Sequence, residues 1–233
     1  MRDKISTITH FVGAVLSIFG LIYLIYKGIK VGSVSYLVAS LIFGISMVLL
    51  YSASTTYHWV RVKDKTLEIF RKIDHMMIFV LIAGTYTPIC IVALGGVFGY
   101  TLLGIVWTIA IVGIILKALW KDMPRKVTTA IYISMGWFSV VALYHLTKSL
   151  PLQGLIFLIL GGVAYTIGGV IYGGKFKIFN FKNFGFHEVF HLFVLSGSFF
   201  HYMMVVTLVW SPSPICEANI GRPHTTWLPR IRL

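Results

Sequence analysis

The chain has 233 residues, of which 58% are hydrophobic and 12% are charged, and its formal net charge at pH 7 is +13. This composition is too apolar and too poor in charge for a soluble domain, so it indicates a polytopic membrane protein. The basic residues lie in short clusters between apolar runs of about 20 residues, which favours a role in membrane topology over a nucleic-acid partner. The two cysteines, Cys90 and Cys216, provide neither a disulfide framework nor a paired-cysteine metal motif.

Seven apolar segments are long enough to cross a bilayer as helices. We place them at residues 10–28, 34–57, 75–95, 98–117, 127–147, 152–173 and 187–210. The predicted fold is therefore all-α, a bundle of seven transmembrane helices that occupies residues 1–210. The remaining residues, 211–233, hold four of the seven prolines and show no hydrophobic periodicity, so we expect a disordered or non-native tail there.

Lysine and arginine are distributed unequally between the two sides of the predicted bundle. Before the tail, 14 of them lie on the side of the N-terminus, and 3 lie on the other side, namely Lys27, Lys30 and Lys148. Because cytoplasmic loops carry the excess of basic residues, we expect the N-terminus in the cytoplasm. An odd number of spans then places the C-terminus outside a cell membrane that the chain crosses several times.

Several polar residues lie at one depth of the predicted bundle, near its cytoplasmic face. His58 ends the second span, Asp74 begins the third, and His187 and His191 begin the seventh. The last two are four residues apart, so they project from one face of a helix about 6 Å apart. Ser54 precedes His58 by the same interval, which stacks its hydroxyl below that imidazole. Three histidines and a carboxylate can therefore meet at one point.

Such a group of residues predicts a zinc site. Three imidazole ligands with one open position are typical of catalytic zinc, and the bound water would then have a pKa of about 7. Asp74 could orient or deprotonate that water, or serve as a fourth ligand. Ser54 could donate to developing oxyanion charge or bond back to a helical carbonyl. The alternative for the His187 and His191 pair is ordinary interfacial polarity.

Three motifs carry a resemblance to a known family. They are "SASTTYH" with Ser54 and His58, "KIDHMMIF" with Asp74, and "HEVFH" with His187 and His191. In order and spacing they resemble the signature of the hemolysin III proteins, the bacterial branch of the progestin and adiponectin receptor family. The resemblance implies a seven-helix bundle with its N-terminus inside. It also implies a zinc ion held by the three histidines, with the aspartate associated with the zinc-bound water.

The N-terminal stretch "DKISTITHFVGAVL" is similar to a further motif of the same family. Here Asp3 and Ser6 stand where the family usually has Glu and Asn, and His10 completes the motif. The resemblance covers about residues 3 to 206. The tail departs from it, because family members usually end shortly after the seventh span.

Three hypotheses of function follow. The first is an intramembrane zinc hydrolase, similar to the ceramidases that the family resembles, which takes a membrane lipid into the bundle and cleaves its amide or ester bond. The second is a receptor or lipid-homeostasis protein in which zinc only braces the helices. The third is a cytolytic membrane protein, as the family label implies. The first hypothesis requires Asp74 and an open zinc position, the second requires only the histidines, and the third requires neither.

Overall fold

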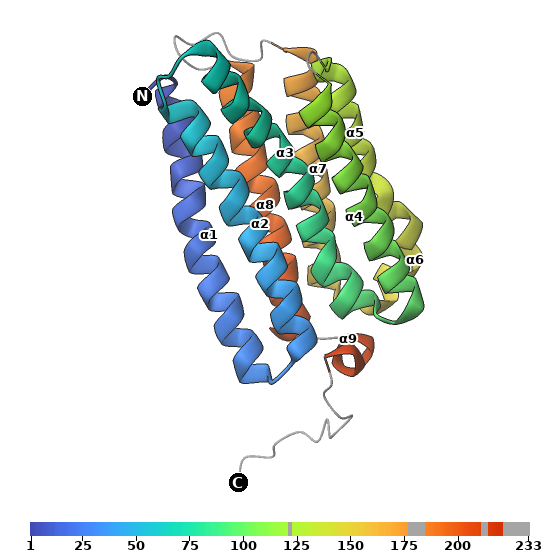
Figure 1. Cartoon of the computed structure of the whole chain (residues 1–233). Helices are drawn as coiled ribbons and strands as arrows, with labels where there is room; N and C mark the ends of the chain where they lie inside the picture. Colours follow the sequence, from blue (N-terminus) through green and yellow to red (C-terminus); the bar gives the residue numbers. More distant parts are fainter. Residues whose placement is uncertain (121–122, 177–184, 211–213, 221–233) are drawn as a thin grey trace.

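The computed structural model describes residues 1–120, 123–176, 185–210 and 214–220, and within them every regular element is helical. Seven helical runs are long and apolar enough to cross a membrane, which confirms the predicted class and number of spans. The elements are α1 (Lys4–Val31), α2 (Val34–Trp59), α3 (Asp64–Pro88), η1 (Ile89–Leu94), α4 (Gly96–Leu119), α5 (Arg125–Trp137), η2 (Phe138–Ala142), α6 (Leu143–Ser149), α7 (Leu152–Gly174), α8 (Phe186–Trp210) and α9 (Pro214–Asn219). They are shown in Figure 1.

Two helices begin well before the predicted spans. The first starts at Lys4 instead of residue 10, and the third starts at Asp64 instead of residue 75. Hydropathy marks only the apolar part of a helix, whereas polar turns continue the same hydrogen-bonding pattern beyond it. Asp64 in the first turn of α3 also favours that end, because the amide groups there carry partial positive charge. As a result Asp74 lies inside a continuous helix.

The third span changes its helical form near its end. Pro88 lies inside α3 and has no N–H to donate, so the regular bonding pattern is interrupted there. The next six residues form the π-helical turn η1, which closes with a bond from the Gly95 N–H to the Cys90 carbonyl of 2.9 Å. Such wide turns commonly accommodate a break in an α-helix.

The fifth span is interrupted by the 3₁₀ stretch η2, between α5 and α6. The Tyr86 hydroxyl of α3 lies at this break. Its one proton is shared between the Met135 and Gly136 carbonyls, at oxygen–oxygen distances of 3.0 and 2.7 Å, and its oxygen accepts from the Ser139 N–H at 2.7 Å. A single phenol therefore satisfies backbone groups that an unbroken helix would have paired internally.

The first two helices form an antiparallel hairpin with a very short connection. Gly32 ends α1 with φ of 71°, a left-handed conformation that glycine adopts without steric cost, and its N–H bonds back to Gly28 and Ile29. Ser33 then caps α2, its side chain accepting from the Tyr36 N–H at 3.2 Å. This turn fixes α1 beside α2 over their whole length (Figure 1).

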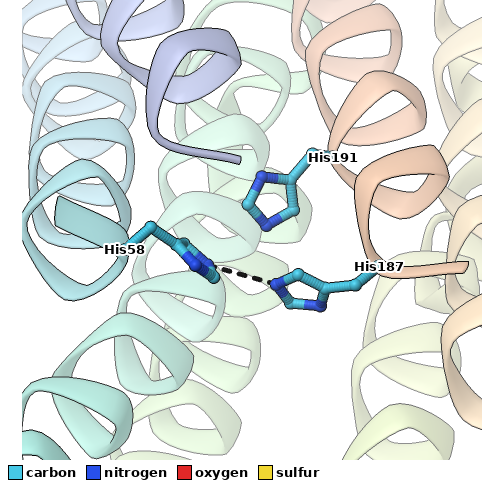
Figure 2. A group of neighbouring side chains, drawn as sticks. All are labelled: His58, His187 and His191. Carbon is cyan, nitrogen blue, oxygen red and sulfur yellow. Dashed lines mark hydrogen bonds between the residues drawn. The ribbon is translucent and has the colours of Figure 1, made fainter. Parts of the chain in front are cut away.

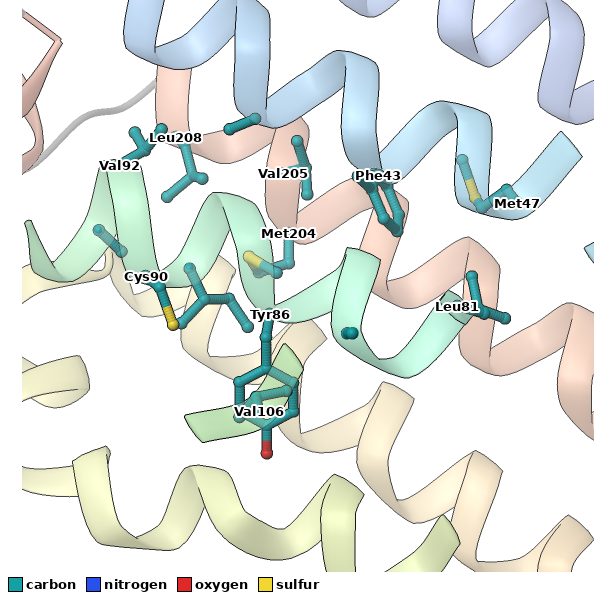
Figure 3. Close-up of a cluster of buried hydrophobic side chains, with 14 of the residues drawn as sticks. Phe43, Met47, Leu81, Tyr86, Cys90, Val92, Val106, Met204, Val205 and Leu208 are labelled. Carbon is teal, nitrogen blue, oxygen red and sulfur yellow. The ribbon is translucent and has the colours of Figure 1, made fainter. Parts of the chain in front are cut away.

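The interior is formed mainly by α2, α3 and α8, while α4, α5 and α7 expose more of their surface. The comparison is clearest in the most apolar stretch of each span. There, 67% of the residues are buried in the third span and 56% in the seventh, compared with 22% in the fourth. The buried side chains form an apolar cluster that includes Phe43, Met204 and Leu208 (Figure 3). Large apolar side chains also cover the outside, as expected of a surface that faces lipid.

Part of the predicted tail is folded. Residues 214–219 form the short helix α9, in which Cys216 donates from its thiol to the Ser149 carbonyl at 3.2 Å. The Asn219 side chain donates to the Val92 carbonyl of η1 at 2.9 Å. This helix therefore packs against the end of the bundle opposite to the N-terminus (Figure 1). Residues 211–213 and 221–233 lie outside the described part of the chain.

Candidate metal site and the adjoining cavity

Three histidines from two helices meet near the end of the bundle where the chain begins. His58 comes from the last turn of α2, and His187 and His191 come from the first two turns of α8. One ring nitrogen of each lies within 4.8 Å of the others, and the two Nε2 atoms of His58 and His187 are 3.1 Å apart. Figure 2 shows the three rings turned toward one another. The prediction that these residues converge is confirmed.

The donor set fits a metal ion. Ligands about 2.1 Å from a tetrahedral metal lie roughly 3.4 Å from one another, close to the spacing of the nitrogens of His58 and His187. Both His58 and His191 are only 2% exposed. Among the described residues, the buried Nδ1 of His191 has no hydrogen-bond partner. Because orphaned polar atoms are rare in folded proteins, the cluster is suited to a bound cation.

The N-terminal segment holds His58 in place. The Asp3 carboxylate accepts a hydrogen bond from His58 Nδ1 at 3.0 Å and another from Arg2 Nε at 3.0 Å. Since the carboxylate accepts, the proton lies on Nδ1 and the Nε2 lone pair points toward the other imidazoles. Burial alone would raise the pKa of Asp3, but the hydrogen bonds from His58 and Arg2 outweigh it and the pKa lies below its ordinary value.

A second carboxylate fixes the start of α8. Glu188 accepts from the Gly185 N–H at 2.8 Å and from the Ser6 hydroxyl at 3.2 Å. An acidic side chain at a helix N-terminus satisfies a free amide and interacts favourably with the helix dipole. The contact also joins α1 to the turn that carries His187, so Asp3 and Ser6 at the N-terminal end of the chain contact both helices that supply the histidines.

Asp74 and Ser54 both line a small cavity of about 20 Å³ beside the cluster, together with His187 and His191. Asp74 is 8% exposed and its Oδ2 lies 3.4 Å from Nδ1 of its neighbour His75. The Ser54 hydroxyl is buried and interacts with the Asp74 carboxylate. Both side chains are therefore near the three imidazoles, in a space of about the size of one water molecule.

A much larger cavity adjoins the small one. It has a volume of about 390 Å³ and is lined mostly by apolar side chains of α3, α5, α7 and α8. The two cavities share five lining residues, which are Leu50, Ile78, Tyr172, Phe190 and Val194. A space of this volume and polarity is typical of a site for a hydrophobic small molecule.

Sequence reasoning missed two contacts of the site. His10 stacks on His191 with ring centroids 3.7 Å apart, and both of its ring nitrogens are buried without a partner in the described part of the chain. The Asp3 contact with His58 was not anticipated either. The signal was the spacing of Asp3, Ser6 and His10 at intervals of three and four, which places them on one helical face.

Comparisons with known proteins give the chain a family. A model of the haemolysin-III related family matches residues 1–202, which include all three histidines. The chain is 41% identical over 210 residues to hemolysin-3 of Bacillus cereus, covering 90% of this chain and 93% of that protein. It is 41% identical over 199 residues to a hemolysin-3 homolog of Bacillus subtilis, covering 85% and 90%. The human monocyte to macrophage differentiation factor is 26% identical over 168 residues, covering 70% and 67%.

Proposed function

The chain belongs to the haemolysin-III related family of membrane proteins, and we propose that it is a zinc-dependent hydrolase that cleaves an amide or ester bond of a membrane lipid. One observation carries this proposal. A buried cluster of three histidines, beside a carboxylate and a hydroxyl, adjoins an apolar cavity of about 390 Å³. Binding of a lipid chain in the large cavity would bring its polar end to the cluster.

The ligand chemistry favours zinc. Zinc accepts imidazole nitrogens in a tetrahedral arrangement, and three protein ligands leave one position open for water or substrate. In that position the metal would polarise a carbonyl and increase the acidity of a bound water. His58, His187 and His191 would be the ligands, with the His58 tautomer set by Asp3.

Asp74 is the proposed general base. It takes a proton from the attacking water while the water oxygen bonds to the lipid carbonyl carbon. The bond from that carbon to nitrogen or oxygen then breaks, and the proton passes to the leaving amine or alkoxide, so the products are a fatty acid and an amine or alcohol. Ser54, whose buried hydroxyl lines the same small cavity, is the proposed donor to the negative charge that develops on the carbonyl oxygen.

The test compares turnover of ceramide-like and phospholipid substrates in detergent by wild type, Asp74→Asn and His187→Ala at matched zinc content. We expect Asp74→Asn to keep the metal and lose about two to four orders of magnitude in rate, because an amide cannot accept the proton. Asp64→Asn is the matched control, since that carboxylate is exposed in the first turn of the same helix. Equal rates for wild type and Asp74→Asn would exclude Asp74 as the base.

The receptor-like alternative has a different outcome in the same samples. If the metal only braces α2 against α8, removing it with EDTA lowers the melting temperature, and wild type releases no product from any substrate. Lysis of membranes that is unaffected by EDTA and by Asp74→Asn would favour the cytolytic alternative instead.

We also propose that the cluster lies near the cytoplasmic face. The start of α1, the end of α2 and the starts of α3 and α8 share one end of the bundle (Figure 1), and the basic residues gather in these connections. In intact cells a membrane-impermeant thiol reagent should label Lys30→Cys but not Lys65→Cys. Labelling of Lys65→Cys alone would reverse the orientation.

A further inference from the structure

His201 lines the large cavity and is held rigidly there. It is 6% exposed, and its ring stacks on Tyr165 of α7 with centroids 5.2 Å apart and planes 16° apart. Its Nδ1 lies 2.8 Å from the Gly197 carbonyl, one turn earlier in α8. The ring also lies close against Gly161, where an added Cβ would come within 2.3 Å of it. Contacts on several sides therefore fix one orientation of the imidazole.

The contact with Gly197 determines which nitrogen is free. A carbonyl can only accept, so Nδ1 carries the proton, and in the neutral imidazole expected of a buried site Nε2 is then a hydrogen-bond acceptor. None of the residues that the structure describes supplies a donor to this Nε2. An acceptor that lines an apolar cavity without a partner costs free energy unless an occupant of the cavity pairs with it.

With the exception of Thr129, the other polar side chains in the described lining of this cavity are paired within the protein. The Tyr86 hydroxyl bonds to the backbone at η2, and the Tyr165 hydroxyl pairs with Ser198 Oγ at 2.8 Å. Thr129 Oγ1 has no partner, but it is buried near the start of α5. His201 is thus distinguished by its place far along α8 from the histidine cluster and by its free acceptor.

We propose that the cavity binds a lipid chain that carries a hydroxyl group part-way along its length, and that this hydroxyl donates to His201 Nε2. The helix rise of about 1.5 Å per residue separates His201 from His191 by roughly 15 Å along α8, which an extended acyl chain covers in about twelve carbons. This inference rests on the proposed function in one respect only, because it assumes that the polar end of the lipid lies at the cluster.

The test measures equilibrium binding of two fatty acids to the zinc-loaded protein in detergent: octadecanoate, and octadecanoate hydroxylated at the twelfth carbon. We expect the hydroxylated acid to bind roughly three- to tenfold more tightly to wild type, the range of one net hydrogen bond. In His201→Phe, which keeps an aromatic ring but has no acceptor, the ratio should fall to about one. His145→Phe is the control, because that ring stacks on Phe98 and does not line the cavity.

The outcomes separate this inference from the proposed function. Equal binding of the two acids to wild type, or a preference that persists in His201→Phe at an unchanged melting temperature, overturns the inference. His201→Leu is a second variant if the phenylalanine does not fit beside Gly161. A clear preference in a protein that hydrolyses no lipid would leave the hydroxyl site standing while the hydrolase proposal fails.

Discussion

At the start of α8, His187 and His191 turn ring nitrogens toward a third imidazole from α2, whereas ten residues further along His201 gives its proton to a carbonyl of its own helix. All three residues are largely buried, so burial does not distinguish them. What differs is the surroundings, because the first two face the nitrogens of other imidazoles and the third lines an apolar cavity. The comparison indicates that convergence of several imidazole nitrogens, and not the burial of histidine, identifies a candidate metal site.

The largest expected effect tests the histidine cluster at the start of α8 directly. Purified protein should contain about one zinc per chain, and His58→Ala, His187→Ala or His191→Ala should each lose most of it, since two remaining imidazoles hold the ion poorly. His201→Phe should keep it. Metal analysis after dialysis measures both. Full zinc content in the double variant of His187 and His191 would show that the metal binds elsewhere.

A smaller effect is expected at Asp3, which acts through His58. Asp3→Asn should weaken zinc binding by about 10- to 100-fold, because a neutral amide orients the imidazole less strongly than a carboxylate does. Asp3→Glu should recover most of the affinity. Competition with a chelator of known affinity gives the values, and Asp64→Asn serves as the exposed control. Unchanged affinity in Asp3→Asn would mean that the bundle alone positions His58.

The smallest expected effect tests the surroundings of His201. Gly161→Ala should destabilise the protein by about 1–3 kcal/mol, because its methyl group would overlap the His201 ring. Gly162→Ala, next to it in α7, meets nothing within 4 Å and should be nearly neutral. Thermal melting in detergent compares the two. Zinc content should not change in either variant, and a loss of zinc in Gly161→Ala would mean that the two regions are coupled.

The sequence alone was sufficient to predict the features that follow from a pattern along one segment of the chain. Apolar runs predicted seven spans, and the places of His58, His187 and His191 at the ends of those spans predicted that these side chains would share one depth. Hydropathy could not predict that α3 begins at Asp64, since a polar turn of a helix resembles a loop in composition. It also gave no indication of the break at η2, which depends on the distant phenol of Tyr86.

The rest of the candidate site depends on contacts between distant parts of the chain. Asp3 and His58 are 55 residues apart, and Ser6 and Glu188 are 182 apart. Periodicity within one helix does not report which face of another helix lies opposite. The stack of His10 on His191 was missed for the same reason, although His10 was recognised as part of a motif.

The division of the ligands between α2 and α8 has a consequence for how the protein is made. His58 and His187 are separated by 129 residues, so during synthesis the first ligand enters the membrane five helices before the other two exist. A ribosome-bound chain that ends before α8 would present one imidazole and could not retain the ion. If the proposed zinc site is correct, metal loading would be a late event, and zinc content would report how many molecules in a preparation have completed assembly of the bundle.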